Sequence, residues 1–151
     1  MNKKKILQYS FTLITMYLVS LNCIAQSVPT ITGLKCENLI NPNAIDNTTP
    51  HLSWKILYDG GKMKQQFYEI QVASDSLALT TGSADVWNTG KFESSSSIMI
   101  PYSGKALSSR SLCYWHVRIW NEKDEVSSWS DIARFGVGIL SSDEWKGKYL
   151  G

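Results

Sequence analysis

Hydrophobic and polar residues alternate one by one along most of the chain after residue 26. The clearest segment is residues 50–57, PHLSWKIL, where Leu52, Trp54 and Ile56 share one side and the residues between them are polar. Such alternation is typical of a β-strand with one buried face, because successive side chains of a strand point to opposite faces. The pattern therefore predicts strands rather than helices.

Seven segments carry this pattern, and clusters of Gly, Pro, Asn and Ser separate them. The predicted strands are Thr30–Cys36 and residues 50–57, 67–74, 86–92, 96–102, 114–120 and 132–138. Residues 74–83 are expected to form one short helical turn at most, and no longer helical stripe is found. We predict an all-β fold, a seven-stranded antiparallel sandwich of the fibronectin type III or immunoglobulin-like type.

The same alternation assigns a hydrophobic core between the two sheets. The residues predicted to point inward are Leu52, Trp54, Ile56, Tyr68, Ile70, Val72, Ile98, Ile100, Tyr102, Trp115, Val117, Ile119, Ala133, Phe135 and Val137. Large aromatic residues bury the most surface, so Trp54, Trp115 and Phe135 are expected to contribute most to stability.

The first 25 residues have the pattern of a signal peptide. Three lysines at positions 3 to 5 precede an uncharged stretch over residues 6–24, and small residues end at Ala25. We expect cleavage near Ala25, a secreted or periplasmic protein, and no membrane contact once the signal is removed. The alternative is a protein anchored in the membrane through residues 6–24, which could nearly span a bilayer.

The charge of the chain changes when residues 1–25 are set aside. Of the 15 basic residues, three lysines lie in this segment, which leaves 12 basic against 13 acidic residues. Without a clustered basic face, a nucleic-acid partner is not expected. The rest is long enough for one domain, which we place at residues 26–140, with residues 141–151 as the start of a linker into a second domain.

Only two cysteines, Cys36 and Cys113, remain after residue 25. Both fall on the inward side of their strands, so they are expected to be two buried thiols or, alternatively, a disulfide in an oxidising compartment. Together with His51 and His116 they show none of the spacings typical of metal ligands. Neither a metal nor a cofactor is expected.

Four residues share the outward side of the strand at residues 114–120: Tyr114, His116, Arg118 and Trp120. Exposed aromatic rings with aligned polar groups can stack on sugars, so this row is a candidate sugar contact. Three other interpretations stay open. Arg118 could form a cation–π ladder with Trp120 or Trp129, a neighbouring domain could cover the row, or the row could pack on the outward side of residues 67–71. His51 and His116 both fall on the outward side of a strand, where either could be an ordinary surface residue.

Seven short motifs follow one another from residue 52 to the end of the sequence. They are LSW at 52–54, FYEIQVAS at 67–74, WNTGK at 87–91, YSG at 102–104, YWHVRIW at 114–120, SSWS at 127–130 and EWKGKYLG at 144–151. In this order they resemble the N-terminal β-sandwich module of bacterial α-L-rhamnosidases, and the resemblance covers about residues 30–151. Two loop positions depart from it: Asn121 stands where aspartate is usual, and Glu125 where a glycine often closes the hairpin.

The resemblance implies a fibronectin type III-like module without the catalytic domain of its parent enzyme. In the family, the element matching residues 144–151 opens the connection to a second β-domain, and the catalytic acids lie farther on, in an (α/α)₆ barrel. We expect a non-catalytic module of a secreted α-L-rhamnosidase, a glycoside hydrolase that removes terminal rhamnose, with later domains of the same parent as its partners. A free-standing carbohydrate-binding or adhesion module, with glycans as partners, is the alternative.

The residues themselves offer no evident catalytic group. Glycoside hydrolysis commonly uses two carboxylates roughly 5–9.5 Å apart, whereas most of the acidic residues fall in predicted turns. The acids of NEKDE, residues 121–125, are expected to form a solvated hairpin turn. Cys113 and His116 point to opposite faces of one strand, which disfavours a nucleophile–base pair. No catalytic residue is assigned, and we do not expect this chain alone to be an enzyme.

Overall fold

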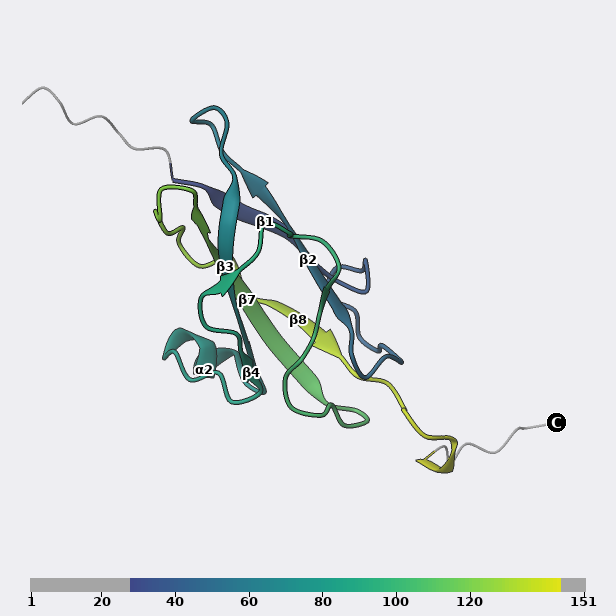
Figure 1. Cartoon of the computed structure of the whole chain (residues 1–151). Coiled ribbons are helices and arrows are strands. Elements are labelled where there is room, and N and C mark those ends of the chain that lie inside the picture. The colour runs from purple at the N-terminus through teal and green to yellow at the C-terminus, as the bar shows by residue number, and fades with distance from the viewer. Residues whose placement is uncertain (1–27, 145–151) are drawn as a thin grey trace, which may run out of the picture.

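The computed structural model describes residues 28–144, which form two antiparallel sheets packed face to face (Figure 1). The first sheet has the order β1 (Thr30–Cys36), β2 (His51–Leu57) and β6 (Ile100–Pro101). The second has the order β4 (Trp87–Asn88), β3 (Gln65–Ala73), β7 (Leu112–Asn121) and β8 (Ala133–Gly136), and β5 (Phe92–Glu93) also pairs with β3. The prediction of an all-β, immunoglobulin-like sandwich is confirmed.

Two short helical segments complete the described chain. The helix α2 (Ser76–Thr80) lies beside β4 and is the one short helical turn expected within residues 74–83. The 3₁₀ turn η1 (Ser142–Glu144) follows the last strand. The expected signal peptide, its cleavage near Ala25 and most of the expected linker lie outside the described residues. Within residues 28–144, no helix is long and apolar enough to cross a membrane.

The predicted strand at residues 86–92 is two short strands in the structure, so residues 28–144 contain eight strands instead of the predicted seven. Gly90 separates them with φ +59°, a left-handed conformation that favours glycine. The side chain of Asn88 fixes this turn, because its Oδ1 accepts a hydrogen bond from the Gly90 N–H at 2.8 Å. The WNTG motif therefore encodes a break between two strands.

The predicted core is confirmed at nearly every position. Trp115, Val117, Ile119, Ile70, Val72, Leu52 and Phe135 are all fully buried between the sheets. Trp54 packs edge-on against Tyr68, with ring centroids 5.4 Å apart, and its Nε1 donates to Gln65 Oε1 at 3.2 Å. The aromatic ring of Trp54 is thus packed inside the core, and its polar N–H group has a hydrogen-bond acceptor there.

Ile98 is an exception, because the prediction that it points inward is wrong. Its side chain is 66% exposed, and β6 begins only at Ile100. The reason is Met99, whose φ of +55° breaks the alternation. The Met99 N–H binds the Ser53 hydroxyl at 2.9 Å, so the segment is attached to β2 through a side chain before the regular pairing starts.

Cys36 and Cys113 are both buried in this core, and the structure has them as free thiols, without a disulfide bond. Burial raises the pKa of Cys36 to about 12 and that of Cys113 to about 11. Neither thiol is therefore a ready nucleophile at neutral pH, since the thiolate is the reactive form.

Ser127 and Ser130 attach the chain to β7 in place of a regular strand. The N–H of Ser127 binds the carbonyl of Ile119, while its hydroxyl accepts the Ile119 N–H at 3.0 Å. Ser130 repeats this arrangement with Val117, whose N–H its hydroxyl accepts at 3.1 Å. The two serine hydroxyls of the SSWS motif thus accept hydrogen bonds from backbone N–H groups at the edge of β7.

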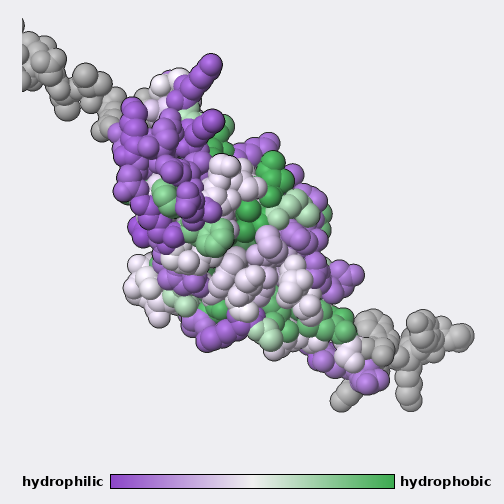
Figure 2. All heavy atoms as spheres, viewed as in Figure 1, coloured by the Kyte–Doolittle hydropathy of each residue, from purple (hydrophilic) through white to green (hydrophobic). Residues whose placement is uncertain are grey.

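Polar turns gather at the end of the sandwich where the described chain begins (Figure 2). The acids of the 121–126 turn fit the expected solvated hairpin: Glu122 and Asp124 are exposed, and Asn121 Oδ1 accepts the N–H groups of Lys123 and Glu125. The residue with positive φ is Asp124, at +62°. The resemblance to the family places a glycine at Glu125. In this turn, however, the left-handed conformation that favours glycine falls one residue earlier, at Asp124.

Replacing Trp54 with alanine is expected to lower the free energy of unfolding by about 3–5 kcal/mol, as for other large core aromatics. Urea or guanidinium unfolding of the two proteins gives the difference. Leu57→Ala, on the same strand but 56% exposed, is the control and should change stability by less than about 0.5 kcal/mol. An unchanged unfolding midpoint for Trp54→Ala would contradict the assignment of Trp54 to the core.

Ser130→Ala is expected to cost about 1–3 kcal/mol, because it leaves the buried N–H of Val117 without an acceptor. The measurement is again equilibrium unfolding. Ser128→Ala removes an exposed hydroxyl two residues away and should be nearly silent. Equal effects of the two substitutions would show that the hydroxyl of Ser130 does not maintain the edge of β7.

Candidate functional site: the outer face of strand β7

The predicted row of Tyr114, His116, Arg118 and Trp120 lies on the outer face of the second sheet, on the side of β7 away from the core. Its members differ in exposure. Tyr114, Arg118 and Trp120 are half-buried, whereas His116 is only 5% exposed. His116 is therefore not the ordinary surface residue that its outward position in the strand allowed.

Trp129 is the reason that His116 is buried. Because Ser127 and Ser130 fasten the chain to β7 on either side of it, Trp129 lies over the row. Its ring stacks on the imidazole of His116 with centroids 3.9 Å apart and planes 10° from parallel. The guanidinium of Arg118 lies 4.6 Å from the same ring.

A chain of hydrogen bonds joins the row to β3, whose residues lie directly opposite in the register. Arg118 binds one carboxylate oxygen of Glu69 through Nε at 2.8 Å and through a terminal nitrogen at 2.6 Å. The other oxygen of Glu69 accepts from the Gln71 amide at 3.1 Å. Gln71 Oε1 in turn lies 3.2 Å from His116 Nε2. A neutral His116 with its proton on Nε2 completes the network as the donor.

Cationic and aromatic groups alternate beyond Arg118. Its guanidinium lies 5.0 Å from the ring of Trp120. Lys91 lies over the rings of Trp120, at 5.2 Å, and Phe67, at 4.5 Å, and it also pairs with Asp124. The ladder proposed from the sequence is therefore present, and the row also packs across the strands on Phe67, Glu69 and Gln71.

The pKa of His116 falls to about 4 in this environment, from an ordinary value of 6.5. Removal from water is the largest cause, because burial disfavours the charged imidazolium. The carboxylate of Glu69 acts in the opposite direction, and the nearby guanidinium of Arg118 lowers the pKa further. His116 is thus a neutral hydrogen-bonding group at physiological pH.

The arrangement is suited to packing rather than to chemistry. The charge of Arg118 is already balanced by Glu69, and His116 is shielded under Trp129. Beside them a shallow hollow of about 600 Å³ continues toward Thr80 and Thr81 at the end of α2. Among the described residues, His, Cys, Asp and Glu side chains form no group of three or more that could hold a metal ion.

Sequence reasoning identified the row but missed two of its partners. Stacking of Trp129 on His116 was not expected, although the serines flanking Trp129 in SSWS could have signalled an anchored ring. The role of Glu69 as the counter-ion of Arg118 was also missed. The strand register could have revealed this pair, because Glu69 and Arg118 lie opposite each other when the two strands pair antiparallel.

Comparison with known proteins shows what this sandwich is. Residues 31–141 match the family described as the Rha78A-like, N-terminal immunoglobulin domain. The chain belongs to this family. The resemblance to the N-terminal module of α-L-rhamnosidases, noted from the sequence motifs, is thereby confirmed.

Relatives and solved structures agree with the assignment. An α-L-rhamnosidase of Formosa agariphila is 37% identical over 76% of this chain, and one of Alteromonas sp. is 37% identical over 80%. The crystal structure of Streptomyces avermitilis α-L-rhamnosidase complexed with L-rhamnose has a TM-score of 0.76 at 30% identity over 80% of this chain. The α-L-rhamnosidase structure from Dictyoglumus thermophilum has a TM-score of 0.76 at 35% identity over 79%.

Each of these proteins is much longer than this chain. The chain spans only 12–13% of the curated relatives and of the two solved structures. The matched part is thus a small, immunoglobulin-like N-terminal module within multidomain proteins.

The family motif YSG has a structural explanation in this chain. Tyr102 is buried, and its hydroxyl donates to the carbonyl of Lys105 at 2.6 Å. Gly104 lies in the bend between them, where an added Cβ would come within 2.5 Å of both Trp87 Cβ and the Tyr102 hydroxyl. A side chain at this position would displace the corner, so the glycine is required by space.

The neutral state of His116 leads to a prediction of how the stability of the fold depends on pH. Its folded pKa of about 4 lies below the unfolded value of about 6.5, so the unfolded chain binds the proton first as the pH falls. This contribution to stability is fully present above pH 6.5 and is lost progressively between about pH 6.5 and pH 4. His116→Phe keeps a ring under Trp129 and removes the titration.

Unfolding free energies measured across this pH range test the prediction. The decline of stability toward acid pH should be shallower in His116→Phe than in the unsubstituted protein, whatever the offset at pH 7. Glu69 and Arg118, the charged groups that face His116, are unchanged in both proteins. Parallel pH profiles would show that His116 is not held neutral in the folded state.

Proposed function

We propose that this chain is the non-catalytic N-terminal module of a secreted α-L-rhamnosidase and that it packs against later domains of the same polypeptide and positions them. Membership in the N-terminal immunoglobulin-like family carries the proposal. The named activity of the relatives supports the assignment of the parent as a hydrolase of terminal α-L-rhamnosides. Secretion rests on the signal-peptide pattern of residues 1–25.

The outer face of β7 is the surface that we assign to interdomain packing. Trp120 and Trp129 remain half-buried there, and neither is enclosed by the sandwich itself. The ladder holds both rings in fixed orientations, so a neighbouring domain could bind them without a large cost in side-chain entropy. Because Glu69 balances Arg118, covering this face would not leave an unpaired buried charge.

The coding DNA beyond codon 151 gives the first test, since the proposal expects an open frame that continues into a large hydrolase. The encoded long protein should release the aglycone from an aryl α-L-rhamnoside, and purified residues 26–151 alone should not. Activity of the short chain would overturn its assignment as non-catalytic.

The interdomain face can be tested by oxidative footprinting of the two proteins. Trp120 and Trp129 should be oxidised more slowly in the long protein than in the module alone, because a later domain shields them. Met99, which is 44% exposed near β6 on the other sheet, is the internal reference. If Trp120 and Trp129 react at the same rates in both proteins, relative to Met99, the outer face of β7 is not the docking surface.

A further inference from the structure

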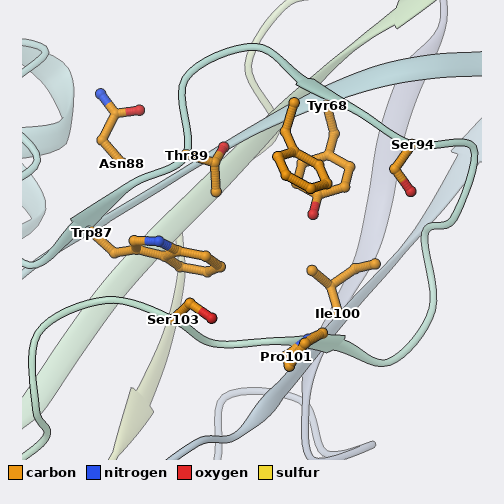
Figure 3. A pocket seen from close by; sticks show the side chains of 9 residues that line it. Tyr68, Trp87, Asn88, Thr89, Ser94, Ile100, Pro101 and Ser103 are labelled. Carbon is orange, nitrogen blue, oxygen red and sulfur yellow. The ribbon is translucent and has the colours of Figure 1, made fainter.

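A second hollow opens on a different side of the sandwich, where the edges of the two sheets separate. It lies between β4 and β5 of the second sheet and β6 of the first, with a volume of about 510 Å³ (Figure 3). We refer to it as the edge groove. Its volume falls in the range of pockets that hold small organic molecules, roughly 300–1,000 Å³.

Tyr68 is the most buried of the residues that line the edge groove. The residue is only 5% exposed, and its ring is held between Trp54, at 5.4 Å, and Phe92, at 5.3 Å. Its hydroxyl makes no hydrogen bond to another described residue and is open to solvent through the groove, where it points into the space between Trp87 and Ile100 (Figure 3). Burial raises the pKa of this hydroxyl above its ordinary value, so it keeps its proton and can donate.

The side chain of Tyr68 is almost fully buried, yet its hydroxyl stays open to the groove, because no buried side-chain oxygen or nitrogen of the described residues lacks a partner. The Tyr102 hydroxyl on the neighbouring segment shows the ordinary case, since it binds a backbone carbonyl. The hydroxyl of Tyr68, by contrast, is available to a ligand that supplies an oxygen atom in the groove.

The walls of the edge groove indicate the chemistry of that ligand. Trp87, Pro101 and the 52% exposed Phe92 provide apolar surfaces, while Ser103 provides a polar group at the rim. The side chain of Asn88 points away from the groove and binds Gly90 (Figure 3), whereas the hydroxyl of the exposed Ser103 makes no hydrogen bond to another described residue. None of the described residues that line the groove is charged.

We propose that the edge groove binds one ring of a neutral carbohydrate, with the Tyr68 hydroxyl as a polar contact. A pyranose combines an apolar C–H face, which fits the rings of Trp87 and Phe92, with hydroxyl groups that can bind to the hydroxyls of Tyr68 and Ser103. The uncharged lining disfavours acidic sugars, whose carboxylate would lose water without gaining a cation. This inference goes beyond the positioning role, which requires no ligand.

The purified chain titrated with single sugars tests the proposal. We expect saturable NMR shifts at Tyr68 and Phe92, with millimolar affinity, for at least one of L-rhamnose, methyl α-L-rhamnoside, D-galactose and D-glucose, and none for D-glucuronate. Tyr68→Phe, which keeps the ring and removes the hydroxyl, should weaken binding about three- to tenfold. Tyr114→Phe removes a hydroxyl from the outer face of β7 and should leave the affinity unchanged.

Phe92→Ala is a second variant, which keeps the proposal testable if Tyr68→Phe fails to fold. Phe92 is exposed and contributes little to the core, so its replacement should leave the fold intact. It should retain the unfolding temperature and weaken binding about threefold or more. No saturable binding of any neutral sugar would overturn the proposal, as would equal affinity in Tyr68→Phe and Phe92→Ala compared with the unsubstituted chain. Because the test uses the module alone, its outcome is independent of how later domains dock.

Discussion

The pairing of β3 with β7 is the constraint on which the rest of the molecule depends. Seven residue pairs lie in continuous register between the two strands, from Phe67 opposite Trp120 to Ala73 opposite Tyr114, and an irregularity separates them from the pair of Gln65 and Asn121. This register places the inward residues of both strands in the core and the outward residues in the ladder. A slip of one residue would exchange the two sets, which would expose Trp115 and bury Arg118 without Glu69. The core and the charged outer face therefore select the same alignment.

The outer face of β7 is ordered by the same kind of reciprocal support. Two serine hydroxyls complete the edge of the strand and thereby hold Trp129 in place. Trp129 removes His116 from water, and the neutral His116 completes the hydrogen-bond chain through Gln71 to Glu69 and Arg118. Each polar group that is buried gains a partner, so the face is rigid without being apolar.

Much of this fold could be predicted from sequence, because it follows from alternation alone. The parity of residues 114–120 separated core from outer face correctly, and the cluster of turn residues at 121–125 marked the hairpin. Backbone conformations outside the usual regions could not be predicted this way. Met99 and Gly90 interrupt strands that the pattern shows as continuous, and Met99 has no sequence signature for positive φ.

The partners of the candidate site were harder to predict for a different physical reason. Alternation says which face a side chain occupies, but not what covers that face. Burial of His116 depends on a ring 13 residues away, held by hydrogen bonds from Ser127 and Ser130. The unpartnered hydroxyl of Tyr68 likewise depends on three segments that meet only in the folded chain. Such features arise from tertiary contacts, which a pattern of hydrophobic residues does not record.

Parity along β3 also determines how two surfaces can serve one small module. Tyr68 and Glu69 are adjacent in sequence, yet one points into the edge groove and the other supports the ladder on the outer face. The two surfaces therefore lie on opposite sides of one strand, and a domain docked over Trp120 and Trp129 would leave the edge groove open to solvent. Packing on one side and recognition on the other are thus compatible in a single sandwich.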